Sequence, residues 1–147
     1  MIINSLKSIF IRDINKLKTE IELFQNEKNM WRIEKGISNS SGNLCLHLIG
    51  NLNAYIGVGL AKTNYVRQRD LEFSLKDIPK VELIKKIEET ILVVEYAFDK
   101  LTDEQMNGNF PIQIWDKPTD VTYTLIQLLT HLNYHLGQIN SQRRLLD

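Results

Sequence analysis

Two histidines near the C-terminus, His131 and His135, have the spacing of side chains on one helix face. Four residues turn an α-helix by about 400°, so the two rings lie one turn apart. The only other histidine, His47, falls in a separate helical segment from Leu44 to Leu60. A pair at this spacing plus one remote partner is typical of a three-histidine metal site with open coordination positions. The sequence therefore predicts a divalent metal bound by His47, His131 and His135.

The alternative for each histidine is an ordinary residue at the edge of the core, hydrogen-bonded to a carbonyl group. The pair reads His131-Leu132-Asn133-Tyr134-His135 and lacks the glutamate of the H-E-x-x-H motif. All three histidines nevertheless lie on two apolar helix faces, which favours a shared site. Cys45 is not expected to join it, because it lies about 200° around the helix from His47. A small buried hydrophobic role suits that cysteine better.

Three neutral imidazoles without a carboxylate leave the charge of a divalent ion uncompensated. Imidazole ligands favour Zn, Ni, Fe or Cu over Mg or Ca, and the open positions attract hydroxide, carboxylate or thiolate. Two activities follow. The ion can activate water for hydrolysis, or it can bind a low-molecular-weight thiol as cosubstrate and present its thiolate to an electrophile.

Three charged residues in the linker that follows the helical segment from Leu44 to Leu60 are further candidates for the functional site. Arg67 and Arg69 could clamp an anion, and Glu72 could act as a general base, if the linker reaches the metal. The alternative is a solvated loop with internal ion pairs.

Amides beside the histidines are also candidates for binding. Asn43 and Asn51 lie one turn on either side of His47, and Gln138 lies close to His135. Each could orient a water molecule or substrate, or could simply be a polar residue at the edge of the core.

Large apolar side chains form another candidate set. Met30, Trp31 and Trp115 could line a pocket near His47 or cover the ends of the core.

Composition limits the class of protein. The 147 residues fit one domain, and 18 Lys+Arg against 18 Asp+Glu give a formal net charge of +0, which argues against a nucleic-acid partner. One cysteine fits a reducing compartment. The N-terminus lacks the apolar core of a signal peptide, and no apolar run approaches the roughly 20 residues of a membrane span. We expect a cytoplasmic protein with a small-molecule substrate and no membrane partner.

Apolar residues recur at helical spacing throughout the chain. They predict helices from about Asn4 to Asn26, from Ser40 or Ser41 to about Leu60, from Pro79 to about Leu101, and from Thr119 or Asp120 onward. Gly50, Gly57 and Gly59 lie within the second helix, weaken it intrinsically and would allow close approach of a neighbour. The segment Phe110–Trp115 could be extended.

The lengths of the connections bear on topology. The linker Thr63–Ile78 could span more than about 50 Å when extended, whereas a helix of about 20 residues is only about 30 Å long. The second and third helices can therefore run parallel. We expect an all-α chain, a four-helix bundle of up-down-down-up topology with a long crossover between helices two and three.

Two segments carry a resemblance to a known superfamily. The stretches Gly42–Leu52 and His131–Ile139 resemble the DinB-like superfamily, also called YfiT-like metal-dependent hydrolases, and Arg67–Phe73 resembles one uncharacterised subgroup. The resemblance covers almost the whole chain in helix order and histidine placement. It implies a single domain over residues 1–147, an up-down-down-up bundle, often a homodimer, with nickel or zinc held by three histidines.

The same resemblance suggests two kinds of reaction. Characterised relatives include thiol S-transferases that use bacillithiol, mycothiol or glutathione, and a maleylpyruvate isomerase. We therefore predict a metal-dependent enzyme of the thiol S-transferase or hydrolase type, without a protein nucleophile. The alternative is a non-catalytic stress-response or binding bundle whose histidines hold a vestigial or adventitious ion.

Overall fold

Helices make up most of the chain in the computed structural model, which describes residues 1–147 and contains no β-strand beyond one isolated bridge. The prediction of an all-α chain is confirmed. The helices are α1 (Ile2–Leu23), a 3-10 turn η1 (Glu27–Trp31), α2 (Ser41–Leu52), a π-helical segment η2 (Asn53–Val58), α3 (Arg69–Ser74), α4 (Lys80–Lys100), α5 (Asp103–Met106) and α6 (Val121–Leu146).

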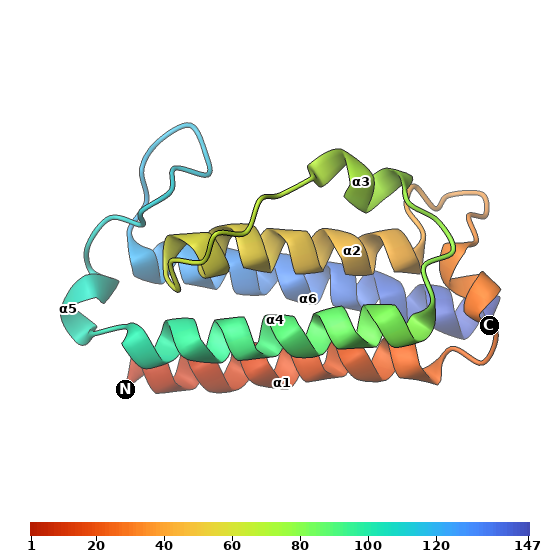
Figure 1. The fold of residues 1–147 in the computed structure, drawn as a ribbon, viewed down its shortest axis with the longest axis horizontal. Helices are drawn as coiled ribbons and strands as arrows, with labels where there is room; N and C mark the ends of the chain where they lie inside the picture. Colours follow the sequence, from red (N-terminus) through yellow and green to blue (C-terminus); the bar gives the residue numbers. More distant parts are fainter.

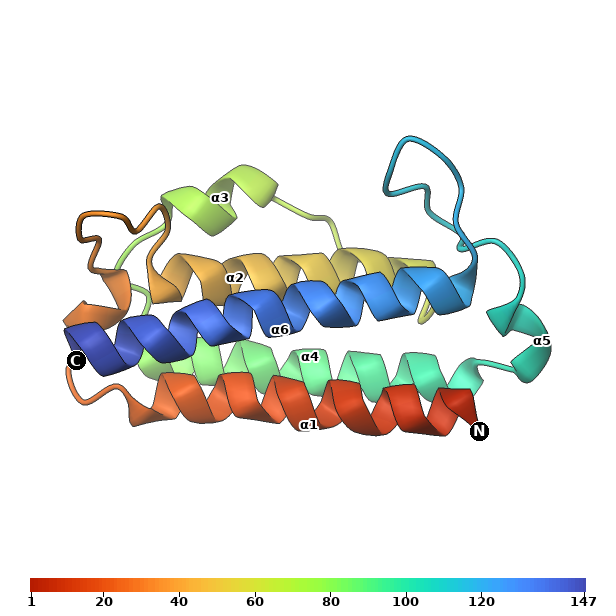
Figure 2. The ribbon, with the colours of Figure 1, turned by 180° about the vertical axis from the view of Figure 1, so that it is seen from behind.

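The four long helices lie side by side along the length of the molecule (Figure 1). Helices α1 and α6 run in one direction, and α2 and α4 run in the other. Each of the four packs on two others, so that α2 lies between α4 and α6 while α1 contacts the same two helices on the opposite side (Figure 2). The short helix α3 passes over the outer side of α2. This arrangement puts α2 between the other long helices and α3.

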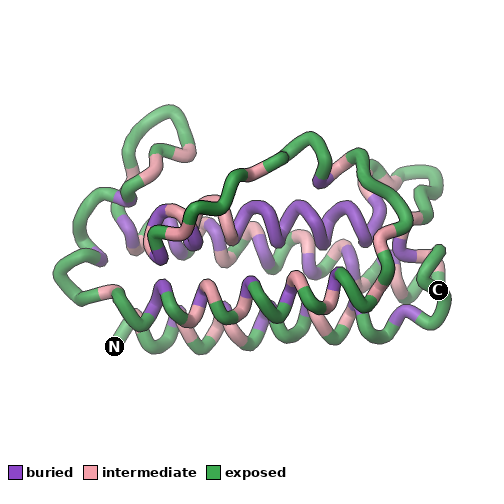
Figure 3. Tube along the Cα trace, in the orientation of Figure 1, coloured by how far each residue is buried: buried purple, intermediate pink, exposed green.

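A single cluster of 28 buried apolar residues fills the space between the helices. In α1, the buried apolar residues recur at helical spacing, as in the predicted first helix: Leu6, Phe10, Ile14, Leu17 and Ile21. Helix α2 differs from the others because all of its residues are buried (Figure 3). Since α3 covers its outer side, even its polar residues are shielded from water.

Capping residues explain where the helices begin. The side chain of Ser40 accepts a hydrogen bond from the Asn43 backbone N–H at the start of α2. Asp120 does the same for Tyr123 at the start of α6, at 2.6 Å. Pro79 directly precedes α4. These starts agree with the sequence prediction, since such side chains satisfy N–H groups that a helix leaves free.

The second helix is less regular than predicted. A regular α-helix ends at Leu52, and the chain continues as the π-helical segment rather than as α-helix to Leu60. The side chain of Asn53 donates to the carbonyl of Ile49, four residues back, at 2.8 Å. Such local bonding and the low helix propensity of Gly57 both disturb regular α-helical geometry.

The linker Thr63–Ile78 is not fully extended, because it contains the six-residue helix α3. A helix of this length has fewer than two turns, so it leaves no detectable periodic pattern in the sequence.

The other differences are small. Helix α1 ends at Leu23 instead of Asn26, and the short helix α5 was not predicted. The Phe110–Trp115 segment forms no strand, since the only bridge joins Asn109 and Asp120. No helix has both the length and the apolar content needed to cross a membrane.

Candidate metal centre

The three histidines of the chain meet between α2 and α6. One ring nitrogen from each of His47, His131 and His135 lies within 4.8 Å of the other two. The Nε2 atoms of His47 and His131 are only 3.1 Å apart. The rings of His131 and His135 stand edge to face, with their centroids 4.6 Å apart. The structure therefore brings together the residues that the sequence analysis predicted as metal ligands.

Helix packing accounts for this convergence. His47 lies on α2 between the buried residues Leu44 and Leu48, and α2 packs against α6. On α6, the two histidines flank Leu132, which is fully buried. Burial of such leucines fixes the rotation of both helices, since each contributes about 1.5–3 kcal/mol.

A carboxylate from α3 lies behind the His47 ring. Glu72 Oε1 is 3.0 Å from His47 Nδ1, and both side chains are buried. Arg67 binds the same carboxylate twice, through Nε to Oε2 at 2.9 Å and through Nη2 to Oε1 at 3.0 Å. An Nδ1–H group donated to Glu72 leaves the lone pair of His47 on Nε2, which faces His131.

Arg67 also lies near the ring itself, with Nη2 3.4 Å from His47 Nδ1. This distance is longer than the 3.0 Å to Glu72, and an arginine cannot accept a proton. The carboxylate is thus the stronger partner and sets the tautomer of the ring.

Gly50 makes room for the carboxylate. A Cβ atom at this position would lie 1.9 Å from Glu72 Oε2. The expectation that a small residue here permits close approach of a neighbour is confirmed, and the neighbour is the acidic side chain of α3.

The other two histidines differ in their partners. His135 Nδ1 lies 2.7 Å from Oε1 of Gln138, three residues along the same helix. Donation of an Nδ1–H group to this oxygen leaves Nε2 of His135 without a proton. In His131, the buried Nδ1 has no hydrogen-bond partner.

Burial keeps two of the rings neutral. Desolvation lowers the pKa of His47, although Glu72 acts in the opposite direction. The pKa of His131 falls to about 4, mainly through desolvation and then through His135, His47 and the nearby arginines. At neutral pH these rings carry lone pairs rather than a second proton, which is the form that binds a metal.

The geometry fits an imidazole-bound metal ion. Two nitrogens bound to tetrahedral zinc at about 2.0–2.1 Å are about 3.3–3.4 Å apart, close to the 3.1 Å between His47 and His131. A carboxylate that accepts from the outer nitrogen of a histidine ligand is a common feature of zinc sites. The cluster could therefore hold a metal ion.

The cluster opens onto a cavity of about 550 Å³, within the usual size range of small-molecule sites. The lining residues are His47, Asn51, Tyr55, Arg67, Arg69, Ile114, Trp115, Gln127, Leu128, Thr130, His131 and Tyr134.

Several predicted candidates lie at this cavity. Asn51 and Arg69 are in its wall. Gln138 instead contacts His135, and Glu72 contacts His47 and Arg67, so each supports a histidine in the structure. The internal ion pair expected as the alternative for the linker is present between Arg67 and Glu72.

Other candidates lie away from the cavity. The Asn43 side chain donates to the carbonyls of Glu72 and Leu75 and thereby ties the α3 segment to α2. Cys45 is fully buried, and burial raises the pKa of its thiol to about 12. Both residues serve the packing around the site.

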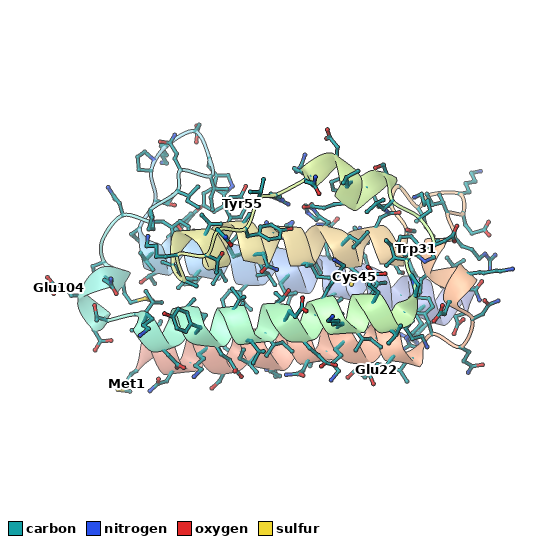
Figure 4. All side chains as sticks on the ribbon, viewed as in Figure 1. Met1, Glu22, Trp31, Cys45, Tyr55 and Glu104 are labelled. Carbon is teal, nitrogen blue, oxygen red and sulfur yellow. The ribbon has the colours of Figure 1, made fainter.

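The large apolar candidates differ in whether they line the cavity. Trp115 lines the cavity, whereas Met30 is wholly buried in the core. Trp31 packs so closely on Gly42 that a Cβ there would lie 2.7 Å from its ring. Figure 4 shows Trp31 near the end of the molecule where α2 begins, whereas Tyr55 lies farther along, in η2, which continues α2. Trp31 thus covers the end of the core.

Sequence reasoning missed six residues of the cavity wall, although helical spacing offers a signal for some of them: Tyr55, Ile114, Gln127, Leu128, Thr130 and Tyr134. Tyr55 lies eight residues after His47, and Gln127 and Tyr134 lie four before and three after His131. Such spacings put side chains on the same helix face. Thr130, directly before His131, has no comparable signal.

A sequence-family comparison covers nearly all of this arrangement. Residues 3–146 match the family described as "Protein of unknown function (DUF1572)". The chain belongs to this family. The DUF1572 match includes all three histidines, Glu72 and Arg67. A comparison with curated proteins yields no match.

Proposed function

We propose that this DUF1572 protein is a metal-dependent enzyme of the hydrolase or thiol S-transferase type, with His47, His131 and His135 as metal ligands. One observation carries the proposal: three imidazoles from two helices meet beside a cavity large enough for a small molecule, and two of them, His47 and His131, line it.

The helix arrangement supports placing the chain in the DinB-like superfamily. Four long helices lie side by side, with α1 and α6 opposed in direction to α2 and α4. This arrangement is consistent with a single-domain up-down-down-up four-helix bundle, in which the crossover between helices two and three carries α3. A homodimer, which the superfamily resemblance also implies, is testable by light scattering.

Each residue around the site has a distinct role in the proposed enzyme. Glu72, held by Arg67, orients His47, and Gln138 orients His135, so that unprotonated nitrogens face a common point. A zinc or nickel ion bound there would supply Lewis acidity that activates water or a thiol. The apolar part of the cavity wall would keep bulk water from the reacting groups.

No side chain of the cavity is an obvious nucleophile. The one cysteine is buried outside the cavity wall, with a raised thiol pKa. The Thr130 hydroxyl donates to the carbonyl of Gln127. A nucleophile that enters from solution, either water or a small thiol, therefore suits the site best.

The proposal is tested by turnover. Zinc- and nickel-loaded protein is assayed with 1-chloro-2,4-dinitrobenzene plus glutathione, mycothiol or bacillithiol, and with activated esters in the absence of thiol. We expect one assay to show turnover that His131→Ala abolishes without a change in the helical circular dichroism spectrum. Leu145→Ala, at an exposed position of the same helix, serves as the control. Equal rates in wild type and His131→Ala would favour the non-catalytic bundle.

A further inference from the structure

The cavity beside the histidines has no acidic side chain. None of its 12 lining residues is an aspartate or a glutamate, whereas two are arginines and two are histidines of the cluster. Glu72, the carboxylate that contacts His47, lies behind the ring and outside the cavity wall. A divalent ion on the histidines would add further positive charge. The electrostatic field in this cavity therefore favours an anion.

The two arginines differ in how far their charge is balanced. Arg67 is held by both oxygens of Glu72, so its charge is largely compensated. Arg69 is exposed and takes part in none of the ion pairs of the structure. Its guanidinium lies over the ring of Phe73, 5.4 Å from the ring centroid, which restricts its direction. Arg69 is thus the cationic group that remains available to a ligand.

A buried amide in the same wall lacks a partner. Asn51 is only 7% exposed, and its Oδ1 atom has no hydrogen-bond partner within the protein. A buried polar atom without a partner costs stability, so a donor group on a bound molecule would satisfy Oδ1 of Asn51.

The rest of the wall is largely aromatic or apolar. Tyr55, Trp115 and Tyr134 contribute rings from three different segments, and Leu128 lies among them. Arg67 lies over the Tyr55 ring, 5.6 Å from its centroid. Such a surface favours a planar or apolar ligand body.

We propose that the cavity takes a small carboxylate with a planar apolar body, its carboxylate bound by Arg69 and a hydrogen-bond donor on its body bound by Oδ1 of Asn51. The planar guanidinium matches a carboxylate through two parallel hydrogen bonds. This inference rests on the proposed function, because it takes the cavity beside the metal ligands as the substrate site.

Binding of two probes tests the inference without any need for turnover. The dissociation constants of 6-hydroxy-2-naphthoate and its neutral counterpart 6-hydroxy-2-naphthamide, both of which carry a hydroxyl donor and are called naphthoate and naphthamide below, are measured by calorimetry on the full zinc-loaded chain. We expect naphthoate to bind about tenfold or more tightly than naphthamide. Arg69→Gln should remove that preference by weakening naphthoate alone. Arg144→Gln, at an exposed arginine in the last turn of α6, should leave both constants unchanged.

Three results would overturn the inference: equal binding of the two probes, equal weakening by Arg69→Gln and Arg144→Gln, or naphthoate binding lost in His131→Ala yet unchanged in Arg69→Gln. The last result would assign the anion to the metal instead of Arg69. The binding test and the turnover test of the proposed function can fail independently of each other. Arg69-dependent naphthoate binding without turnover would preserve the binding inference and reject the enzyme, and turnover of neutral substrates alone would do the reverse.

Discussion

At the scale of single residues, the hydrogen bond between His47 and Glu72 links the candidate metal ligands to the rest of the protein. The carboxylate is buried, paired with Arg67 and 3.0 Å from Nδ1 of the ring. We infer that Glu72 is a positioning residue, because it acts on a metal through the histidine.

Glu72→Gln should therefore weaken zinc binding by about 10–100-fold, the usual effect of losing such a partner. The amide keeps the size of the side chain but loses the negative charge that accepts the Nδ1–H group. Competition with a chromophoric chelator measures the affinity. Asp70→Asn removes a charge from the same short helix at an exposed position and should have little effect. Equal affinities of wild type and Glu72→Gln would contradict this role.

The pKa of His131 predicts how acid affects the metal-free protein. The pKa of this ring in the folded chain is about 4, against an ordinary value of 6.5. As the pH falls from about 6.5 to about 4, the unfolded chain takes up a proton on this ring and the folded chain does not, so the free energy of unfolding decreases. His47 acts in the same direction.

His131→Gln should accordingly lose less stability than wild type between pH 7 and pH 4. Urea unfolding at a series of pH values, with a chelator present, gives the two curves. Carboxylates titrate in both proteins, so the difference between the curves isolates the histidine. Curves of the same slope would show that this ring is not held neutral in the folded protein.

At the scale of elements, the docking of α3 on α2 decides whether the support of His47 is in place. Gly50 is the point of closest approach, since an added Cβ would meet the Glu72 carboxylate. Asn43 holds the same segment through two backbone carbonyls.

Gly50→Ala should displace α3 and lower zinc affinity while leaving the four long helices folded. Alanine favours the helix by up to about 1 kcal/mol, which offsets part of the steric cost to global stability. Amide hydrogen exchange of residues 69–74 should become faster. Gly137→Ala is the matched control, because nothing lies within 4 Å of its added Cβ, and it should only stabilise. Unchanged exchange and zinc affinity in Gly50→Ala would refute the docking role.

At the scale of the whole molecule, the core and the candidate site occupy different parts of the helix packing. Phe10 of α1 and Phe98 of α4 are buried with ring centroids 5.5 Å apart, whereas the histidines come from α2 and α6. Stability and metal binding should therefore respond to different substitutions.

Phe10→Ala should lower the free energy of unfolding by about 3–5 kcal/mol, through lost burial and the cavity left behind. Below the unfolding transition, its zinc affinity should stay within about twofold of wild type. Leu92→Ala, at an exposed position of α4, should change stability by less than about 0.5 kcal/mol. A large loss of zinc affinity in folded Phe10→Ala would show that the core and the site are coupled.

Much of this organisation could be predicted from the sequence. The long helices leave periodic apolar stripes over many turns, and Ser40 and Asp120 are recognisable caps. The shared position of the histidines could be predicted because all of them lie on apolar faces. The element α3 could not, since it is too short for periodicity.

The roles of the linker residues could not be separated by sequence alone. Arg67 and Arg69 are two residues apart, yet one is paired with Glu72 and the other faces the cavity without an ionic partner. This difference depends on how α3 packs on Gly50, a long-range contact that leaves no local pattern. The same holds for Trp31 and Trp115, whose different places follow from tertiary packing.

The central claim is that imidazoles from two helices bind one metal ion. X-ray absorption spectroscopy of the zinc-loaded protein tests it most directly. The account predicts one zinc per chain with three imidazole nitrogens at about 2.0–2.1 Å, falling to two in His47→Ala. A spectrum with fewer than three imidazoles, or one that His47→Ala leaves unchanged, would contradict it.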